Sequence, residues 1–256
     1  MRRAILDKLR GWVLAALMMA AGAVPAHAEK PDLSSIHTLG VISVIGHSIA
    51  LKNVGLMIFG NSLDTLDSSG WGIDGAVQDE IATALSDRFT LKPVTVDPVA
   101  FSTQATSWWN SSEVPVEDLV AALPDREGID TYMVVYPFPL QDPVYGTNQF
   151  IRGLGVYRHG GFGEAVSLYA LYRCVIVDAK TNKIVWQTFG MLGKFGFFDH
   201  PYPIAKIDPS AWAEKADALT DTQRDAIKTG MTDLVRKSLR WALAYGGLIP
   251  EPPSGN

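Results

Sequence analysis

Apolar and polar positions in the first half of the chain alternate in a way that predicts strands interleaved with helices. Residues 39–45 form an apolar, β-branched run bounded by glycines, and residues 54–59 form a second run of the same kind. We expect both to be strands, paired with each other through a turn at residues 46–48. In residues 73–85 every fourth position is apolar, which predicts a helix with one buried face and Asp74 as its N-cap.

The rest of the pattern predicts further strands and two more helices. The strand segments are residues 92–97, 131–136, 151–157, 165–177 and 183–191, and a short helix is expected at 116–123. The last three strands are joined by short turns, so we expect them to form an antiparallel meander. A capping box of Thr220 and Gln223 precedes an apolar stripe that predicts a long C-terminal helix, which Gly246 can end.

This order of elements predicts an α/β (α+β) fold. Strand–helix–strand units place parallel strands side by side, and the meander adds antiparallel strands to the same sheet. The expected result is a mixed sheet with a parallel βαβ part and an antiparallel meander, flanked by helices. We expect one such domain over residues 37–246, with a short tail at 29–36 before it and a disordered tail at 247–256 after it.

Residues 1–28 have the three parts of a secretion signal. Four basic residues lie in the first ten, an apolar run of 13 residues covers 12–24, and Ala26-His27-Ala28 supplies the ending of small residues. A helix needs about 20 residues to span a bilayer, so we expect cleavage after Ala28 and no stable membrane span in the mature chain. The expected location is periplasmic or secreted, in a bacterium.

Charge and cysteine content narrow the range of partners. Loss of residues 1–28 removes four basic residues and one acidic residue, which changes the net charge from −5 to −8. Such an acidic chain repels phosphate backbones, so nucleic acid is excluded as a partner. The only cysteine, Cys174, lies in an apolar run far from the cleavage site, and we interpret it as a buried core residue. It permits no internal disulfide and no lipid attachment at the mature N-terminus.

Ser48 is the candidate catalytic nucleophile. Residues 46–50 are similar to the nucleophile elbow of hydrolases, and Asp199 with His200 could complete a triad in space. An elbow needs a strand before the serine and a helix after it. A strand-like stretch follows Ser48 instead, so a serine hydrolase is kept only as an alternative.

The sequence predicts no metal site and no cofactor. The histidines are scattered without the spacing of a zinc site. The glycines of residues 153–155 and 160–163 lie between two predicted strands, whereas a dinucleotide-binding loop must join a strand to a helix.

Aromatic residues in loops are the candidate partner-binding residues. Trp71, Trp108, Trp109 and Tyr145 lie in segments rich in glycine, serine and proline. Tryptophan is favoured in binding hot spots. It is also usually buried, so packing of these rings against the core is the competing interpretation.

One hairpin of the meander carries a resemblance to a known group of proteins. Residues 175–178 end a strand at an aspartate, and residues 181–186 lead through a Thr-Asn-Lys turn into a strand with Trp186. Together with the N-terminal strand pair, the helix after residues 71–74 and the terminal helix, this order resembles the α/β domain of bacterial envelope-assembly proteins. Examples are the curli-secretion lipoprotein and the lipoprotein activators of penicillin-binding proteins. The resemblance covers residues 37–246 and implies a non-catalytic scaffold, although those proteins carry a lipid-attachment cysteine that this chain lacks.

These patterns together predict an exported, periplasmic, non-enzymatic protein that binds an envelope protein partner during cell-envelope assembly. Two alternatives stay open. One is an extracytoplasmic serine hydrolase built on Ser48. The other is a small-ligand binding module with a pocket under the loops at residues 100–113 and 137–149.

Overall fold

The computed structural model describes residues 33–55, 60–98, 101, 114–160, 165–194 and 201–253. The chain separates into two units, Met1–Pro31 and Asp32–Asn256, and every described residue belongs to the second unit. The predicted secretion signal therefore lies outside the described residues.

The described residues form a mixed sheet of ten strands together with three α-helices. The strands are β1 (Thr38–Ser43), β2 (Ser48–Val54), β3 (Ser62–Asp67), β4 (Thr90–Pro93), β5 (Thr131–Pro137), β6 (Pro139–Gln141), β7 (Phe150–His159), β8 (Ala165–Asp178), β9 (Ile184–Phe189) and β10 (Ile204–Ile207). The helices are α2 (Ile73–Leu85), α4 (Val116–Ala121) and α5 (Asp221–Tyr245). This is the α+β class that the sequence predicts, with parallel and antiparallel strands and a long C-terminal helix.

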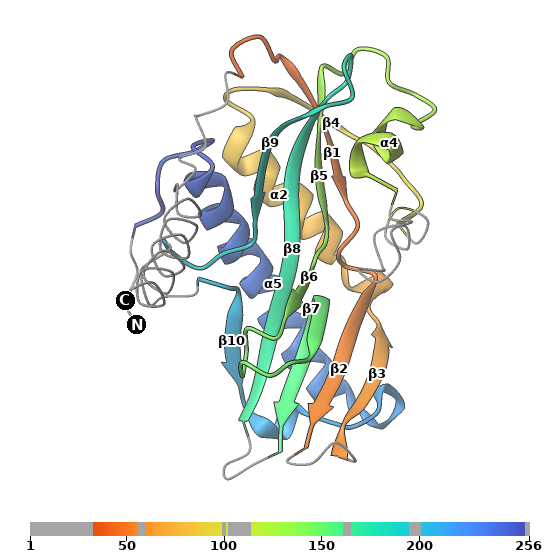
Figure 1. The fold of residues 1–256 in the computed structure, drawn as a ribbon, viewed down its shortest axis with the longest axis vertical. Coiled ribbons are helices and arrows are strands. Elements are labelled where there is room, and N and C mark those ends of the chain that lie inside the picture. Colours follow the sequence, from red (N-terminus) through yellow and green to blue (C-terminus); the bar gives the residue numbers. More distant parts are fainter. Residues whose placement is uncertain are drawn as a thin grey trace, which may run out of the picture. The chain divides into compact units, whose positions relative to one another are not determined.

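The long strand β8 runs along the whole length of the sheet (Figure 1). Its two ends pair with different strands, so the sheet consists of two halves that follow one another along β8. Its C-terminal half pairs with β5 and β9, and its N-terminal half pairs with β7 and β10, all of them antiparallel. In each half the next strand outward is parallel to its neighbour: β1 lies beside β5, and β2 lies beside β7. β4 and β3 complete the outer edges, and β6 pairs with β7. The two halves thus share one arrangement as far as β1 and β2, but the outermost strands differ, because β4 is parallel to β1 and β3 is antiparallel to β2.

β1 and β2 do not form the hairpin that the sequence predicts. β2 ends at Val54, where the predicted strand 54–59 begins, and residues 56–59 lie outside the described residues. β2 lies beside β3 and β7 instead of β1. Residues 44–47 connect β1 in one half of the sheet to β2 in the other, and the two strands run in the same direction. This is because β1 is parallel to β5 and β2 is parallel to β7, and both β5 and β7 are antiparallel to β8. The Asp74 carboxylate holds this crossing, since it accepts hydrogen bonds from the Ser43 hydroxyl (2.6 Å) and the Ile45 amide (2.9 Å).

Asp74 is consequently not the N-cap of α2, which the sequence predicts it to be. Gly72 occupies the cap in the left-handed region, with φ of 74°, and Asp74 lies in the first turn of the helix. The bounds of α2 agree with the prediction. β3, β6 and β10 are absent from the prediction, because β3 is rich in polar residues and β6 and β10 contain only 3 and 4 residues.

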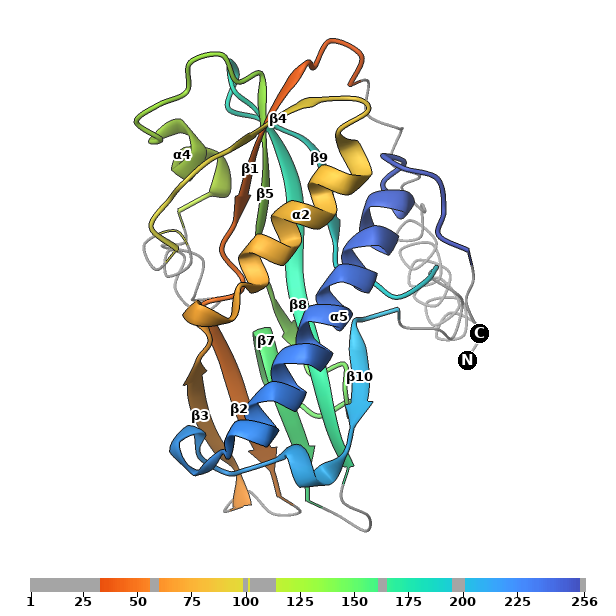
Figure 2. The same cartoon turned by 180° about the vertical axis from the view of Figure 1, so that it is seen from behind.

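The two long helices cover one face of the sheet (Figure 2). α5 begins with the predicted capping box, in which Thr220 and Gln223 each accept a hydrogen bond from the other's backbone amide. The apolar stripe of α5 packs with α2 and with one side of β8 in the main core. α4 lies on the opposite face, over the half of the sheet that contains β1 and β5. Among the described helices, none combines the length and the apolar character needed to cross a membrane.

An ion pair between Glu80 of α2 and Arg240 of α5 joins the two helices. The Glu80 side chain is only 6% exposed, and the Arg240 guanidinium donates to both of its carboxylate oxygens, at 3.2 Å for Oε2. We expect Arg240→Ala to lower the free energy of unfolding by about 2 kcal/mol, because the buried carboxylate loses its partner. Urea unfolding measures the change, with the exposed Arg236→Ala one turn earlier as the matched control. Equal effects of the two substitutions would show that the ion pair contributes nothing.

Candidate functional site

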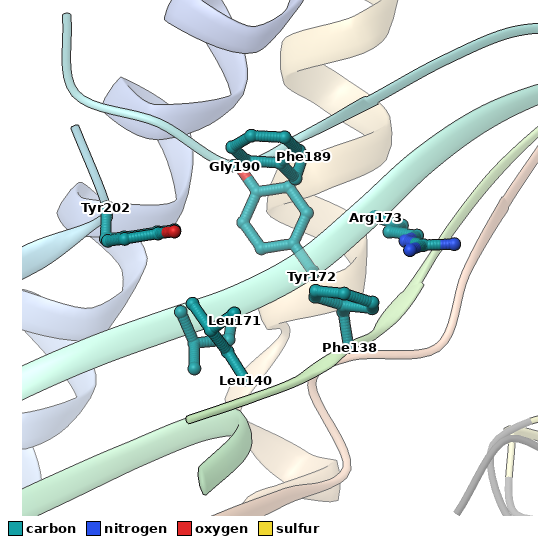
Figure 3. Close-up of a pocket in the computed structure, with 8 residues that line it drawn as sticks. All are labelled: Phe138, Leu140, Leu171, Tyr172, Arg173, Phe189, Gly190 and Tyr202. Carbon is teal, nitrogen blue, oxygen red and sulfur yellow. The ribbon is translucent and has the colours of Figure 1, made fainter. Parts of the chain in front are cut away.

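A cavity opens on the face of the sheet opposite α2 and α5, where the two halves of the sheet meet. Its volume is about 150 Å³, and its walls are mostly apolar and aromatic. They come from the β5–β6 junction, from β8, from the end of β9 and from the segment before β10 (Figure 3). The lining residues are Phe138, Leu140, Leu171, Tyr172, Arg173, Phe189, Gly190 and Tyr202.

This cavity forms because β8 changes its neighbours at this point. β7 pairs with the first part of β8, from Ala165 to Leu171, and β5 pairs with the second part, from Tyr172 to Asp178. On the other edge, β9 ends at Phe189 and β10 begins only at Ile204. Side chains from the diverging strands therefore surround the space beside the middle of β8.

Two stacked pairs of side chains shape the walls. The guanidinium of Arg173 lies over the ring of Phe138, with Cζ 4.1 Å from the ring centroid. The rings of Phe189 and Tyr202 stack with their centroids 6.4 Å apart and an interplanar angle of 29°. Aromatic rings offer a large apolar area with few rotatable bonds, which suits a preformed recognition site.

A buried carboxylate holds the loop between β6 and β7, which follows Leu140 of the cavity wall. The Asp142 carboxylate accepts hydrogen bonds from the amides of Val144 and Tyr145, from the amide and hydroxyl of Thr147, and from the hydroxyl of Tyr157 (2.9 Å). Burial raises the pKa of Asp142, but these hydrogen bonds together outweigh burial and hold the pKa below its usual range. The carboxylate is therefore ionised at neutral pH.

A second cavity, of about 300 Å³, lies beside α4 on the same face of the sheet. The described residues that line it are Phe101, Val114, Pro115, Val116, Glu117, Leu119, Tyr136, Arg173 and Ile184. Arg173 lines both cavities. Its stacking on Phe138 uses the face of the guanidinium plane and leaves the N–H groups at the edge of that plane. Within the described residues, no acceptor binds those N–H groups.

The aromatic residues predicted to bind a partner do not line these cavities as far as the structure describes them. Trp71 is partly buried and packs against the main core. Tyr145 is also partly buried, and its hydroxyl donates to the carbonyl of Ala165 at 3.1 Å. Trp108 and Trp109 lie outside the described residues.

Ser48 occupies the first position of β2, so a strand follows it where a nucleophile elbow has a helix. Its Oγ lies 3.4 Å from Nε2 of the neighbouring His47. Nδ1 of His47 is buried and has no hydrogen-bond partner among the described residues, whereas a catalytic triad needs a carboxylate there to orient the ring. Asp199 and His200 lie outside the described residues. Within the described residues, Ser48 therefore lacks the helix that follows the serine of a nucleophile elbow.

Metal-binding clusters are not found in the part of the chain that the structure describes: no three histidine, cysteine or acidic side chains lie close enough to hold an ion. Cys174 is buried in the main core, as the sequence predicts. Burial raises the pKa of its thiol, which keeps the sulfur protonated and unreactive.

Comparisons with known proteins add one structural likeness. No family model matches the chain, and no curated protein matches it. Among solved structures, the chain is similar to the crystal structure of protein XCC0632 from Xanthomonas campestris, of the family model DUF330. The sequence identity is 10% and the TM-score is 0.32, and the match covers 88% of this chain and 91% of that chain. At this level of likeness the comparison assigns no function to the chain.

Sequence reasoning alone does not single out the residues that line the first cavity. Phe138 and Leu140 fall in a segment predicted to be an irregular loop, and Arg173 falls within a predicted strand. The available signal was an arginine on an otherwise apolar strand, since burial of an arginine requires a partner or a route to solvent.

Proposed function

We propose that the chain is an exported, non-enzymatic protein of the cell envelope that binds a partner polypeptide. In this proposal one apolar side chain of the partner enters the cavity between Phe138, Leu140 and Tyr202. The observation that carries the proposal is the aromatic cavity itself, which opens where β8 changes neighbours. The pattern of residues 1–28 supports export, and the resemblance to envelope-assembly domains supports the setting.

The size of the cavity favours a side chain over a metabolite. Pockets for small molecules typically enclose about 300–1000 Å³. A cavity of about 150 Å³ is large enough for a group of the size of benzene. Partner proteins are commonly held by a few buried anchors of that size. The second cavity, of about 300 Å³, reaches the lower end of the small-molecule range and supports the small-ligand alternative.

We expect Leu140→Trp to reduce capture of the partner at least about tenfold, because the indole fills the space that the anchor would enter. The tagged mature chain is used to capture proteins from crosslinked bacterial envelopes. Mass spectrometry then compares the amount of each captured protein between the wild type and the variant.

Leu63→Trp is the matched control for this experiment. Leu63 is 68% exposed on the outer edge strand β3, so the same substitution there adds an indole without filling the cavity. A partner that is lost with Leu140→Trp and retained with Leu63→Trp supports the proposal. Equal capture by the wild type and by a Leu140→Trp variant with an unchanged near-UV circular dichroism spectrum contradicts it.

A further inference from the structure

Arg173 differs from several other arginines because no acceptor for its hydrogen-bond donors is found within the described residues. Arg88 donates to the Leu248 carbonyl, Arg126 donates to the Ala179 carbonyl, and Arg224 donates to the Ala216 carbonyl. The guanidinium of Arg173 is instead held in place by its stacking over a ring of the cavity wall. A stacked guanidinium still presents its fork of N–H groups in the plane, which is the geometry that binds a carboxylate with two parallel hydrogen bonds.

We propose that Arg173 binds the C-terminal carboxylate of the partner polypeptide and that the partner's last side chain is the anchor in the cavity. This inference rests on the proposed function, because it names the chemistry of the partner at the same site. The class of ligand is a polypeptide that ends in an apolar residue of roughly the size of phenylalanine.

Distance along the partner favours the terminal carboxylate over an acidic side chain. Arg173 and Phe138 line the same small cavity, so the anion must lie next to the residue that fills it. In an extended peptide, side chains on the same side are two residues apart, which is about 7 Å. The α-carboxylate of a terminal residue is bonded directly to the Cα that carries the anchor. A single residue therefore supplies both groups that the site accepts.

Charge near the site gives the carboxylate one direction of approach. The mature chain has a net charge of −8, so an anion is attracted only where a local positive charge is exposed to it. Glu117 lines the second cavity on the other side of Arg173 and would repel an anion there. Among the described residues that line the first cavity, none is acidic. The anion is thus expected at the edge of Arg173 that faces the first cavity.

The test uses three fluorescein-labelled pentapeptides and the mature chain. The first is Gly-Ser-Gly-Ala-Phe with a free C-terminal carboxylate, and the second is the same peptide with a C-terminal amide. The third is Gly-Ser-Glu-Ala-Phe amide, which carries its acid on the residue two positions before the anchor. Fluorescence anisotropy measures binding to the wild type and to Arg173→Gln, Leu140→Trp and Lys206→Gln. Lys206 is an exposed cation of β10, and its substitution is the charge-matched control.

We expect the free acid to bind at least about tenfold more tightly than either amide, which is the usual value of a charge-assisted hydrogen bond. Arg173→Gln should remove this difference, Lys206→Gln should keep it, and Leu140→Trp should weaken all three peptides. If the acid and the amides bind equally while Leu140→Trp still weakens them, the carboxylate assignment is overturned and the cavity proposal survives. Equal binding of the acid and the glutamate peptide also overturns it, in favour of an acidic side chain. Absence of binding by every peptide up to about 1 mM overturns both proposals.

Discussion

Gly155→Ala is expected to lower the free energy of unfolding by about 3 kcal/mol, since overpacking a rigid core is costly. Gly155 of β7 lies directly opposite Tyr169 of β8, and the Tyr169 ring crosses over it. A Cβ added at Gly155 would lie 2.2 Å from the phenol oxygen and from Cζ of that ring. Tyr169 is 1% exposed and has no open space in which to move. Urea unfolding measures the change.

Two further variants show whether the ring is the cause. Gly75→Ala makes the same substitution in α2, where nothing lies within 4 Å of the added Cβ, and it is expected to raise stability by about 0.5–1 kcal/mol. Tyr169→Leu combined with Gly155→Ala should cost less than the sum of the two single substitutions. If the two effects simply add, Tyr169 is not what opposes a side chain at position 155.

Asp142→Ala is expected to cost about 3 kcal/mol of stability, because it leaves the buried Tyr157 hydroxyl and several backbone amides without their acceptor. The exposed Asp87→Ala is the matched control and should change stability by less than about 0.5 kcal/mol. Urea unfolding of both variants gives the comparison. Equal stabilities of Asp142→Ala and the wild type would contradict the role of this carboxylate.

The effect of Asp142 should also depend on pH. Because the folded protein holds the pKa of Asp142 below its usual range, the stabilisation from its charge is fully present above the ordinary carboxylate pKa of about 4. It is lost as the pH falls through the lower pKa of the folded state. The difference in stability between the wild type and Asp142→Ala is therefore expected to stay constant between about pH 5 and pH 8 and to shrink in stronger acid.

The same substitution connects stability with binding. Asp142 holds the loop that follows β6, and Leu140 of β6 forms part of the cavity wall. We expect Asp142→Ala to weaken the free-acid peptide at least about tenfold at a temperature at which the variant is still folded, because the wall loses its fixed position. Unchanged peptide binding would show that the cavity does not depend on this loop.

The sequence by itself determined the elements whose signals are local. An apolar side chain at every fourth position defines α2, and a capping box defines the start of α5. Five predicted strands, 39–45, 131–136, 151–157, 165–177 and 183–191, lie within two residues of the observed bounds. Each of these signals depends on neighbours within a few residues, and the order of the elements was enough to predict a mixed sheet flanked by helices.

Only the tertiary structure decided which strands lie side by side. β2 pairs with β7, which is about one hundred residues away along the chain, rather than with the adjacent β1. Alternation along a strand tells which side chains share a face, but it contains no information about which strand lies next to it. The cavity follows from such a choice, because it exists only where β8 exchanges β5 for β7. Arg173 became a candidate binding residue for the same reason. Long-range pairing of β5 with β8 placed Phe138 under its guanidinium, which leaves the N–H groups at the edge of the guanidinium plane.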